Sequence, residues 1–124
     1  MRPFGTVATL AAVMLALPAA GEEPLSYAQY QDQTYHDSTL VKHYIEGLLA
    51  GFDLANSRLA AKSQPTLYCK PALLPIDAET AQKMMDTYID DNRRTVVIKG
   101  YFKIDTSLLA ALINAFPCPG AAAK

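Results

Sequence analysis

The sequence lacks the features that mark most nucleic-acid-binding proteins, membrane-surface proteins and enzymes. Its 124 residues carry 11 basic and 12 acidic side chains, and the formal net charge is −1. Basic residues form neither a polybasic run nor a stripe interleaved with aromatic residues, so nucleic acid and membrane surfaces are poor partners. There is also no Gly-rich phosphate loop, no nucleophile elbow and no convincing pair of catalytic carboxylates. We therefore expect a protein that is not an enzyme and needs no cofactor.

A long apolar run is missing too. The charge-free stretch Val7–Leu17 is too short to cross a bilayer, which takes about 20 residues. It follows a positively charged N-terminus and precedes small residues, which is the layout of a secretory signal peptide. We expect residues 1–21 to be removed near Ala20/Gly21, leaving an exported chain that does not stay on the membrane. An N-terminal anchor that is never cleaved is the alternative.

Cysteine is scarce, and the predicted export of the chain indicates the role of the two cysteines that are present. Cys69 and Cys118 are the only cysteines. In an oxidising compartment two cysteines normally pair, and both lie beside prolines and hydrophobic residues without a local base. We predict a disulfide, which would stabilise the fold by about 4 kcal/mol in the chain-entropy model. A catalytic thiol with a nearby histidine is the alternative.

Histidine is equally scarce, and this bears on metal binding. His36 and His43 are the only two histidines, and Asp37 follows the first. Two histidines and a carboxylate can bind zinc, but this spacing matches no recognised ligand pattern. We expect no metal site.

The chain that remains after the leader has the size of one domain. Residues 22–36 are polar and rich in tyrosine, and we expect a weakly ordered arm with at most one or two helical turns. Residues 37–119 should form the folded domain, and residues 120–124 a disordered tail.

One long helix is predicted at the start of this domain. Asp37 or Ser38 can cap it, and apolar residues then recur at steps of three and four until about residue 61. Gly47 and Gly51 lie inside it on one face, where each costs about 1 kcal/mol relative to alanine. We interpret both as a place of close approach by another helix of this chain. Close approach by a partner chain is the alternative.

Two shorter helices and a connector complete the predicted fold. Asp77 should cap a second helix, whose apolar positions follow a helical period. Residues 95–104 are β-branched and aromatic, which favours an extended connector, and Asp105 should cap the last helix, which ends before Pro117. The sequence therefore predicts an all-α fold, a small helical bundle with one disulfide and a short extended connector.

Two loops are candidates for contact with a partner. Residues 62–75 are stiffened by prolines and hold few charges, so we interpret them as scaffold. The other candidate combines both signs of charge, and arginine is enriched among interface hot spots. We predict partner contacts in this second loop, with a solvated turn as the alternative. The residues of the loop are Asp90, Asp91, Asn92, Arg93 and Arg94.

Three segments follow one another in a characteristic order. They are Tyr44-Ile45-Glu46-Gly47 with Gly51-Phe52 and Ala55-Asn56, then Leu67-Tyr68-Cys69-Lys70-Pro71, then Phe116-Pro117-Cys118. Together they resemble the Tai-type (type VI amidase immunity) and resistance-associated immunity protein family over residues 40–119. The chain departs from that family in having no further cysteines upstream and a more β-branched stretch at residues 95–104.

The resemblance implies an all-helical periplasmic protein, often a homodimer. Such a protein binds a peptidoglycan-cleaving amidase delivered by type VI secretion and blocks its active site. A secreted cell-wall amidase is therefore the expected partner. A second hypothesis stays open, namely a periplasmic chaperone or stress protein of the small, disulfide-bonded helical kind.

Overall fold

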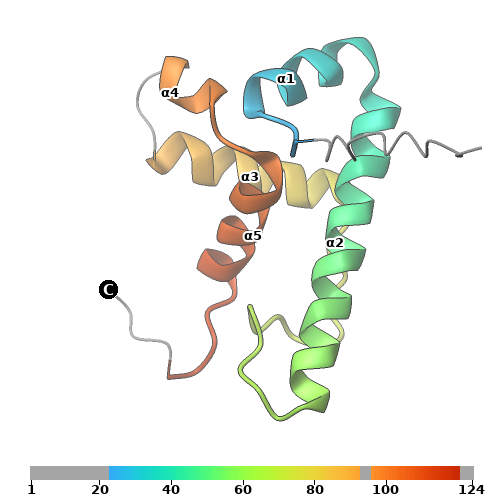
Figure 1. The fold of residues 1–124 in the computed structure, drawn as a ribbon, viewed down its shortest axis with the longest axis vertical. Coiled ribbons are helices and arrows are strands. Elements are labelled where there is room, and N and C mark those ends of the chain that lie inside the picture. The colour runs from blue at the N-terminus through green and yellow to red at the C-terminus, as the bar shows by residue number, and fades with distance from the viewer. Residues whose placement is uncertain (1–22, 93–95, 121–124) are drawn as a thin grey trace, which may run out of the picture.

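The computed structural model describes residues 23–92 and 96–120, and in these ranges it contains five α-helices and no strand (Figure 1). The helices are α1 (Tyr27–His36), α2 (Ser38–Ala61), α3 (Ala78–Asn92), α4 (Val96–Gly100) and α5 (Ile104–Ala115). The predicted all-α fold with one disulfide is confirmed. The predicted signal peptide, Arg93, Arg94 and most of the predicted tail lie outside the described residues.

Helix α2 forms one edge of the molecule, and the other four helices lie on one side of it (Figure 1). Asp37 caps it as predicted, because its Oδ1 accepts a hydrogen bond from the backbone N–H of Leu40 at 3.0 Å. Val41 and Ile45 are fully buried against the rest of the fold. No helix within the described ranges is long and apolar enough to cross a membrane.

The core lies between α2, α3 and α5. The apolar positions predicted for α3 point inward, with Ala81, Met85 and Ile89 buried at steps of four residues. Leu108 and Leu112 of α5 are fully buried against them. Helix α3 is therefore covered on one side by α2 and on another by α5, and little of it can move independently.

The prediction of a weakly ordered arm at residues 22–36 is wrong. Helix α1 has a capping box, in which Ser26 Oγ accepts from the Gln29 N–H at 3.2 Å and Gln29 Oε1 accepts from the Ser26 N–H at 2.9 Å. Tyr27 and Tyr30 are buried in the core, with ring centroids 5.5 Å apart. Burial of two aromatic rings supplies the stabilisation that the polar arm itself lacks.

A backbone contact between the residues before α1 and the residues before α5 holds α1 in place. The Tyr27 N–H donates to the Phe102 carbonyl at 2.6 Å, and the Ile104 N–H donates to the Leu25 carbonyl at 2.8 Å. These bonds form an isolated antiparallel bridge between Ser26 and Lys103. Residues before α1 and residues before α5 therefore fix each other's position.

The structure corrects two predictions in the C-terminal half, and the same contact explains the second of them. Residues Val96–Gly100 are helical, so the extended connector is wrong for them. Helix α5 begins at Ile104, which is fully buried, and Asp105 lies inside the first turn rather than at the cap. Burial of Ile104 and its bond to Leu25 set the start of the helix, and these outweigh the capping preference of the aspartate.

The interpretation of Gly47 and Gly51 as sites of close packing within the chain is also wrong. A Cβ atom placed on either glycine would meet no atom within 4 Å. Both residues are exposed on the outer side of α2, away from the core. The alternative, approach by a partner chain, stays a prediction.

The disulfide between Cys69 and Cys118 is confirmed, with sulfur atoms 2.03 Å apart and Cα atoms 4.8 Å apart. Next to it the Cys69 N–H donates to the Phe116 carbonyl at 2.8 Å. The bridge ties the loop after α2 to the end of α5. It also excludes the alternative of a catalytic thiol, because neither cysteine is free.

Asn56 holds the other side of the same loop. Its Oδ1 accepts from the Leu67 N–H at 2.7 Å, and its Nδ2 donates to the Tyr68 carbonyl at 3.1 Å. The buried Tyr68 also donates its hydroxyl to Asp53 Oδ1 at 2.7 Å. The loop is therefore fixed to α2 by side chains and to the C-terminal end by the disulfide.

Candidate partner-binding surface

A groove of about 400 Å³ lies between the outer side of α3 and the end of α5. Its apolar part comes from Met84 and Tyr88, which are partly buried beside the core. Polar groups surround them, and they are contributed by Lys83, Asp91, Asn92 and Asn114. The groove thus offers an apolar floor with a cation, an anion and two amides at its rim, which suits a protein partner better than a small apolar ligand.

The groove contains part of the predicted partner loop. Asp90, Asp91 and Asn92 are the last three residues of α3, so this part of the prediction lies on a helix end rather than in a loop. Asp91 and Asn92 line the groove, whereas Asp90 forms an ion pair with Lys99 of α4. The structure therefore brings two of the predicted residues to one surface and assigns the third to a contact between helices.

The charge at this helix end is unusual. The C-terminal end of a helix carries a partial negative charge, which disfavours nearby carboxylates. Asp90 and Asp91 nevertheless occupy the last turn of α3, and no basic residue lies in that turn. Lys99 offsets the charge of Asp90. The exposed carboxylate of Asp91 lines the groove at the helix end that disfavours it.

The second candidate loop, residues 62–75, has the character of a scaffold. Lys70 Nζ donates to the Leu74 carbonyl within the loop at 2.9 Å. The loop is also held by Asn56 and by the disulfide. Its most exposed apolar side chain is Leu73, which is 95% exposed.

Asp86 is a functional group that the sequence patterns did not indicate. It is half-buried between α3 and α1, where Tyr27 Oη donates to its Oδ1 at 3.2 Å. Burial raises the pKa of Asp86, the neighbouring charge of Asp90 raises it further, and hydrogen bonds from Tyr27 and Tyr30 oppose the rise. Burial, followed by the charge of Asp86, raises the pKa of Tyr27 to about 12. No local pattern signals this contact, because it joins residues far apart in the sequence.

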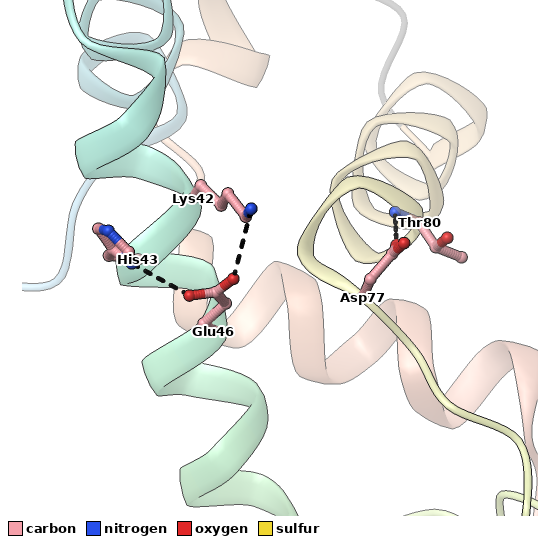
Figure 2. A network of polar contacts seen from close by, with 5 residues as sticks. All are labelled: Lys42, His43, Glu46, Asp77 and Thr80. Carbon is pink, nitrogen blue, oxygen red and sulfur yellow. Dashed lines mark hydrogen bonds and ion pairs between the residues drawn. The ribbon is translucent and has the colours of Figure 1, made fainter.

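The two histidines do not form a common site. His36 contacts Asp32 at 3.5 Å, whereas His43 contacts Glu46 at 3.1 Å. Figure 2 shows Glu46 between His43 and Lys42 on α2. In the part of the chain that the structure describes, no three His, Cys, Asp or Glu side chains are grouped so that they could hold a metal ion.

Asp77, drawn in the same view, has a structural role (Figure 2). Its Oδ1 accepts from the Thr80 N–H at 2.7 Å, and it caps α3 as predicted. Hydrogen bonds from the Thr80 side chain and backbone lower the pKa of Asp77. The cap keeps the N-terminal end of α3 in a defined position, and with it the end of the groove that Thr80 lines.

Comparisons of this chain with protein-family models, with curated proteins and with solved structures find no match. The resemblance to the immunity proteins therefore rests on the sequence segments alone.

Proposed function

We propose that this chain is a periplasmic immunity protein. It binds a type VI secreted peptidoglycan amidase and blocks the active site of that toxin. The contact surface is the α3–α5 groove together with the acidic end of α3. Residues 1–21 export the chain, and the disulfide between Cys69 and Cys118 fits the oxidising compartment to which it is delivered.

One observation supports this proposal most strongly, namely the carboxylate of Asp91 at the C-terminal end of α3. A carboxylate at this position reduces the stability of the helix. A residue that is unfavourable for its own helix and exposed at a groove is better explained by a contact with another molecule. Residues that serve binding often reduce the stability of the protein that carries them.

The groove has two further properties that suit an inhibitor. Helix α3 is packed on α2 and α5, so binding orders little additional chain and the entropy cost of association is small. Met84 can adapt to the shape of a partner side chain, and Tyr88 offers an aromatic contact of the kind enriched at interfaces.

The decisive experiment is Asp91→Lys, measured against the cell-wall amidase encoded beside the gene for this chain. The variant should melt at the same or a higher temperature, because a cation favours a helix C-terminus. Its affinity for the amidase should fall about tenfold or more. Undiminished affinity would remove the acidic end of α3 from the interface.

Asp32→Lys is the matched control. Asp32 is an exposed acidic residue in the C-terminal half of α1, where it contacts His36, and it does not line the groove. It should leave amidase affinity unchanged. A gene neighbourhood without any cell-wall amidase would count against the immunity function itself.

One observation favours the second hypothesis, a periplasmic chaperone or stress protein. Asp86 has a raised pKa at the contact between α1 and α3, so acidification changes the charge inside this fold. This hypothesis expects suppression of client aggregation that appears in acid and needs no amidase. Equal suppression at neutral and acidic pH would contradict it.

A further inference from the structure

A second hollow, of about 660 Å³, lies between the start of α1 and the turn that joins α4 to α5. Helices α1 and α4 contact each other at this end of the molecule (Figure 1). Two segments that are far apart in the sequence line the hollow, and they are residues 23–29 and residues 100–103. We call it the α1–α4 hollow.

Backbone hydrogen bonds fix the two walls of the α1–α4 hollow relative to each other. The isolated antiparallel bridge joins Ser26 to Lys103, and both residues line the hollow. The backbone bonds beside this bridge, from Tyr27 to Phe102 and from Ile104 to Leu25, are 2.6 Å and 2.8 Å long. Because these bonds hold the walls without a ligand, binding needs little ordering of the chain and its entropy cost is small.

The α1–α4 hollow has a shallow base of small residues and an aromatic side. A Cβ atom on Gly100 would lie 3.5 Å from the Cβ atom of Ala28, so these two residues meet closely and neither fills the space above them. Tyr101 lies next to them and is 80% exposed. Its ring therefore offers a flat apolar face to a bound molecule.

Polar groups of both kinds surround this aromatic face. Gln29 Oε1 accepts from the Ser26 N–H at 2.9 Å, so the Nε2 group of Gln29 is the part of its amide that can donate to a ligand. Glu23 supplies acceptor oxygens and Lys103 supplies N–H donors, and these two side chains lie 3.5 Å apart as a surface ion pair. Their charges offset each other, and the lining carries no net charge.

This combination of groups favours one class of ligand. A lining without net charge attracts neither anions nor cations over a distance. A wholly apolar ligand would cover polar groups without giving them hydrogen bonds, which is unfavourable. A neutral molecule that has an apolar face and hydroxyl groups along its edge satisfies both parts of the lining, and a sugar ring has this chemistry.

We propose that the α1–α4 hollow binds an oligosaccharide. One sugar ring stacks on Tyr101 through the C–H groups of its apolar face. The hydroxyl groups of the sugar donate to the carboxylate of Glu23 and accept from Gln29 and Lys103. The base at Ala28 and Gly100 leaves room for the ring beside the tyrosine.

This site does not depend on the proposed immunity function. The α3–α5 groove and the α1–α4 hollow share no lining residue. Asp91→Lys should therefore leave oligosaccharide binding unchanged, although it weakens amidase binding. The two proposals can fail separately.

An NMR titration of the full chain with chitotriose and with maltotriose tests the site. Amide signals of residues 26–29 and 100–103 should shift with at least one of the two sugars. Tyr101→Ala should weaken this binding about tenfold, because it removes the stacking surface. Tyr101→Phe keeps the ring and should keep most of the affinity. An absence of shifts with both sugars at their highest soluble concentrations would overturn the proposal.

Tyr35→Ala is the matched control. Tyr35 is 86% exposed near the end of α1, its ring contacts His36, and it does not line the hollow. The change should leave oligosaccharide binding intact, and a loss equal to that of Tyr101→Ala would refute the site. Adenosine is a second probe, because its base is flat but lacks the hydroxyl groups of a sugar ring on its edge. Adenosine that shifts the same signals as strongly as the sugars would refute the assignment to an oligosaccharide.

Discussion

Asn56 is the side chain whose removal should report most directly on how the disulfide-bonded loop is held. Its amide makes both of its hydrogen bonds to the backbone of Leu67 and Tyr68, at 2.7 Å and 3.1 Å. Asn56→Ala removes both bonds and leaves a partly buried N–H and carbonyl without their partner.

These contacts determine the expected loss of folding free energy. Two hydrogen bonds at about 1 kcal/mol each give about 2 kcal/mol. Alanine is the better helix former, which returns about 0.5 kcal/mol at this position inside α2. The net destabilisation is therefore about 1.5 kcal/mol. For a domain of this size it should lower the melting temperature by about 6–12 °C.

Amide hydrogen exchange shows at which backbone N–H groups the protection is lost. In the variant the Leu67 N–H should lose its protection, because Asn56 is its acceptor. The Cys69 N–H should keep its protection, because its acceptor is the Phe116 carbonyl. Asn114→Ala, a change at an exposed asparagine of α5, controls for helix propensity and should not destabilise. An unchanged melting temperature with Leu67 still protected would refute the reasoning.

Three other predictions concern the glycines, the disulfide and Asp86. Gly47→Ala and Gly51→Ala should each raise the unfolding free energy of the dilute chain by about 1 kcal/mol in urea titrations, and a decrease would mean that the space around them is filled. Cys118→Ser should lower that free energy by about 4 kcal/mol, since the bridge joins residues 49 apart; an equal stability of oxidised and reduced wild type would contradict this. The folded pKa of Asp86 is raised, so its contribution to stability is present below the unfolded pKa and is lost as pH rises through the folded value. Asp86→Asn should therefore flatten the pH dependence of the denaturation midpoint. An unchanged pH profile would mean that other groups cause this pH dependence.

Elements with local causes were predictable from the sequence. The capping of α2 by Asp37 and of α3 by Asp77 depends on residues within one turn, and both caps form. The inward face of α3 depends only on helical period. The disulfide could be predicted without knowledge of the fold, because the chain contains only two cysteines.

Elements with distant causes were not predictable. Helix α1 is stabilised by Tyr27, whose hydroxyl contacts Asp86 and whose N–H contacts Phe102. No window of neighbouring residues contains these contacts. The same holds for the start of α5, where burial of Ile104 overrides the capping preference of Asp105.

The candidate site was partly predictable for the same reason. Asp91 and Asn92 stood out as polar residues after an amphipathic helix, but their place on a groove depends on how α5 packs beside α3. The exposure of Gly47 could not be predicted, because helical period gives only a residue's angle around the helix. It does not say which angles are covered.

The bridge between Ser26 and Lys103 has a consequence for the order of synthesis. The acceptor of the Tyr27 N–H, the Phe102 carbonyl, lies far along the chain from α1. During synthesis α1 can therefore pack on α2 and α3 before residue 102 is made, whereas the backbone bridge forms only afterwards. A chain shortened before residue 102 keeps the contacts of α1 with α2 and α3 and loses the bridge.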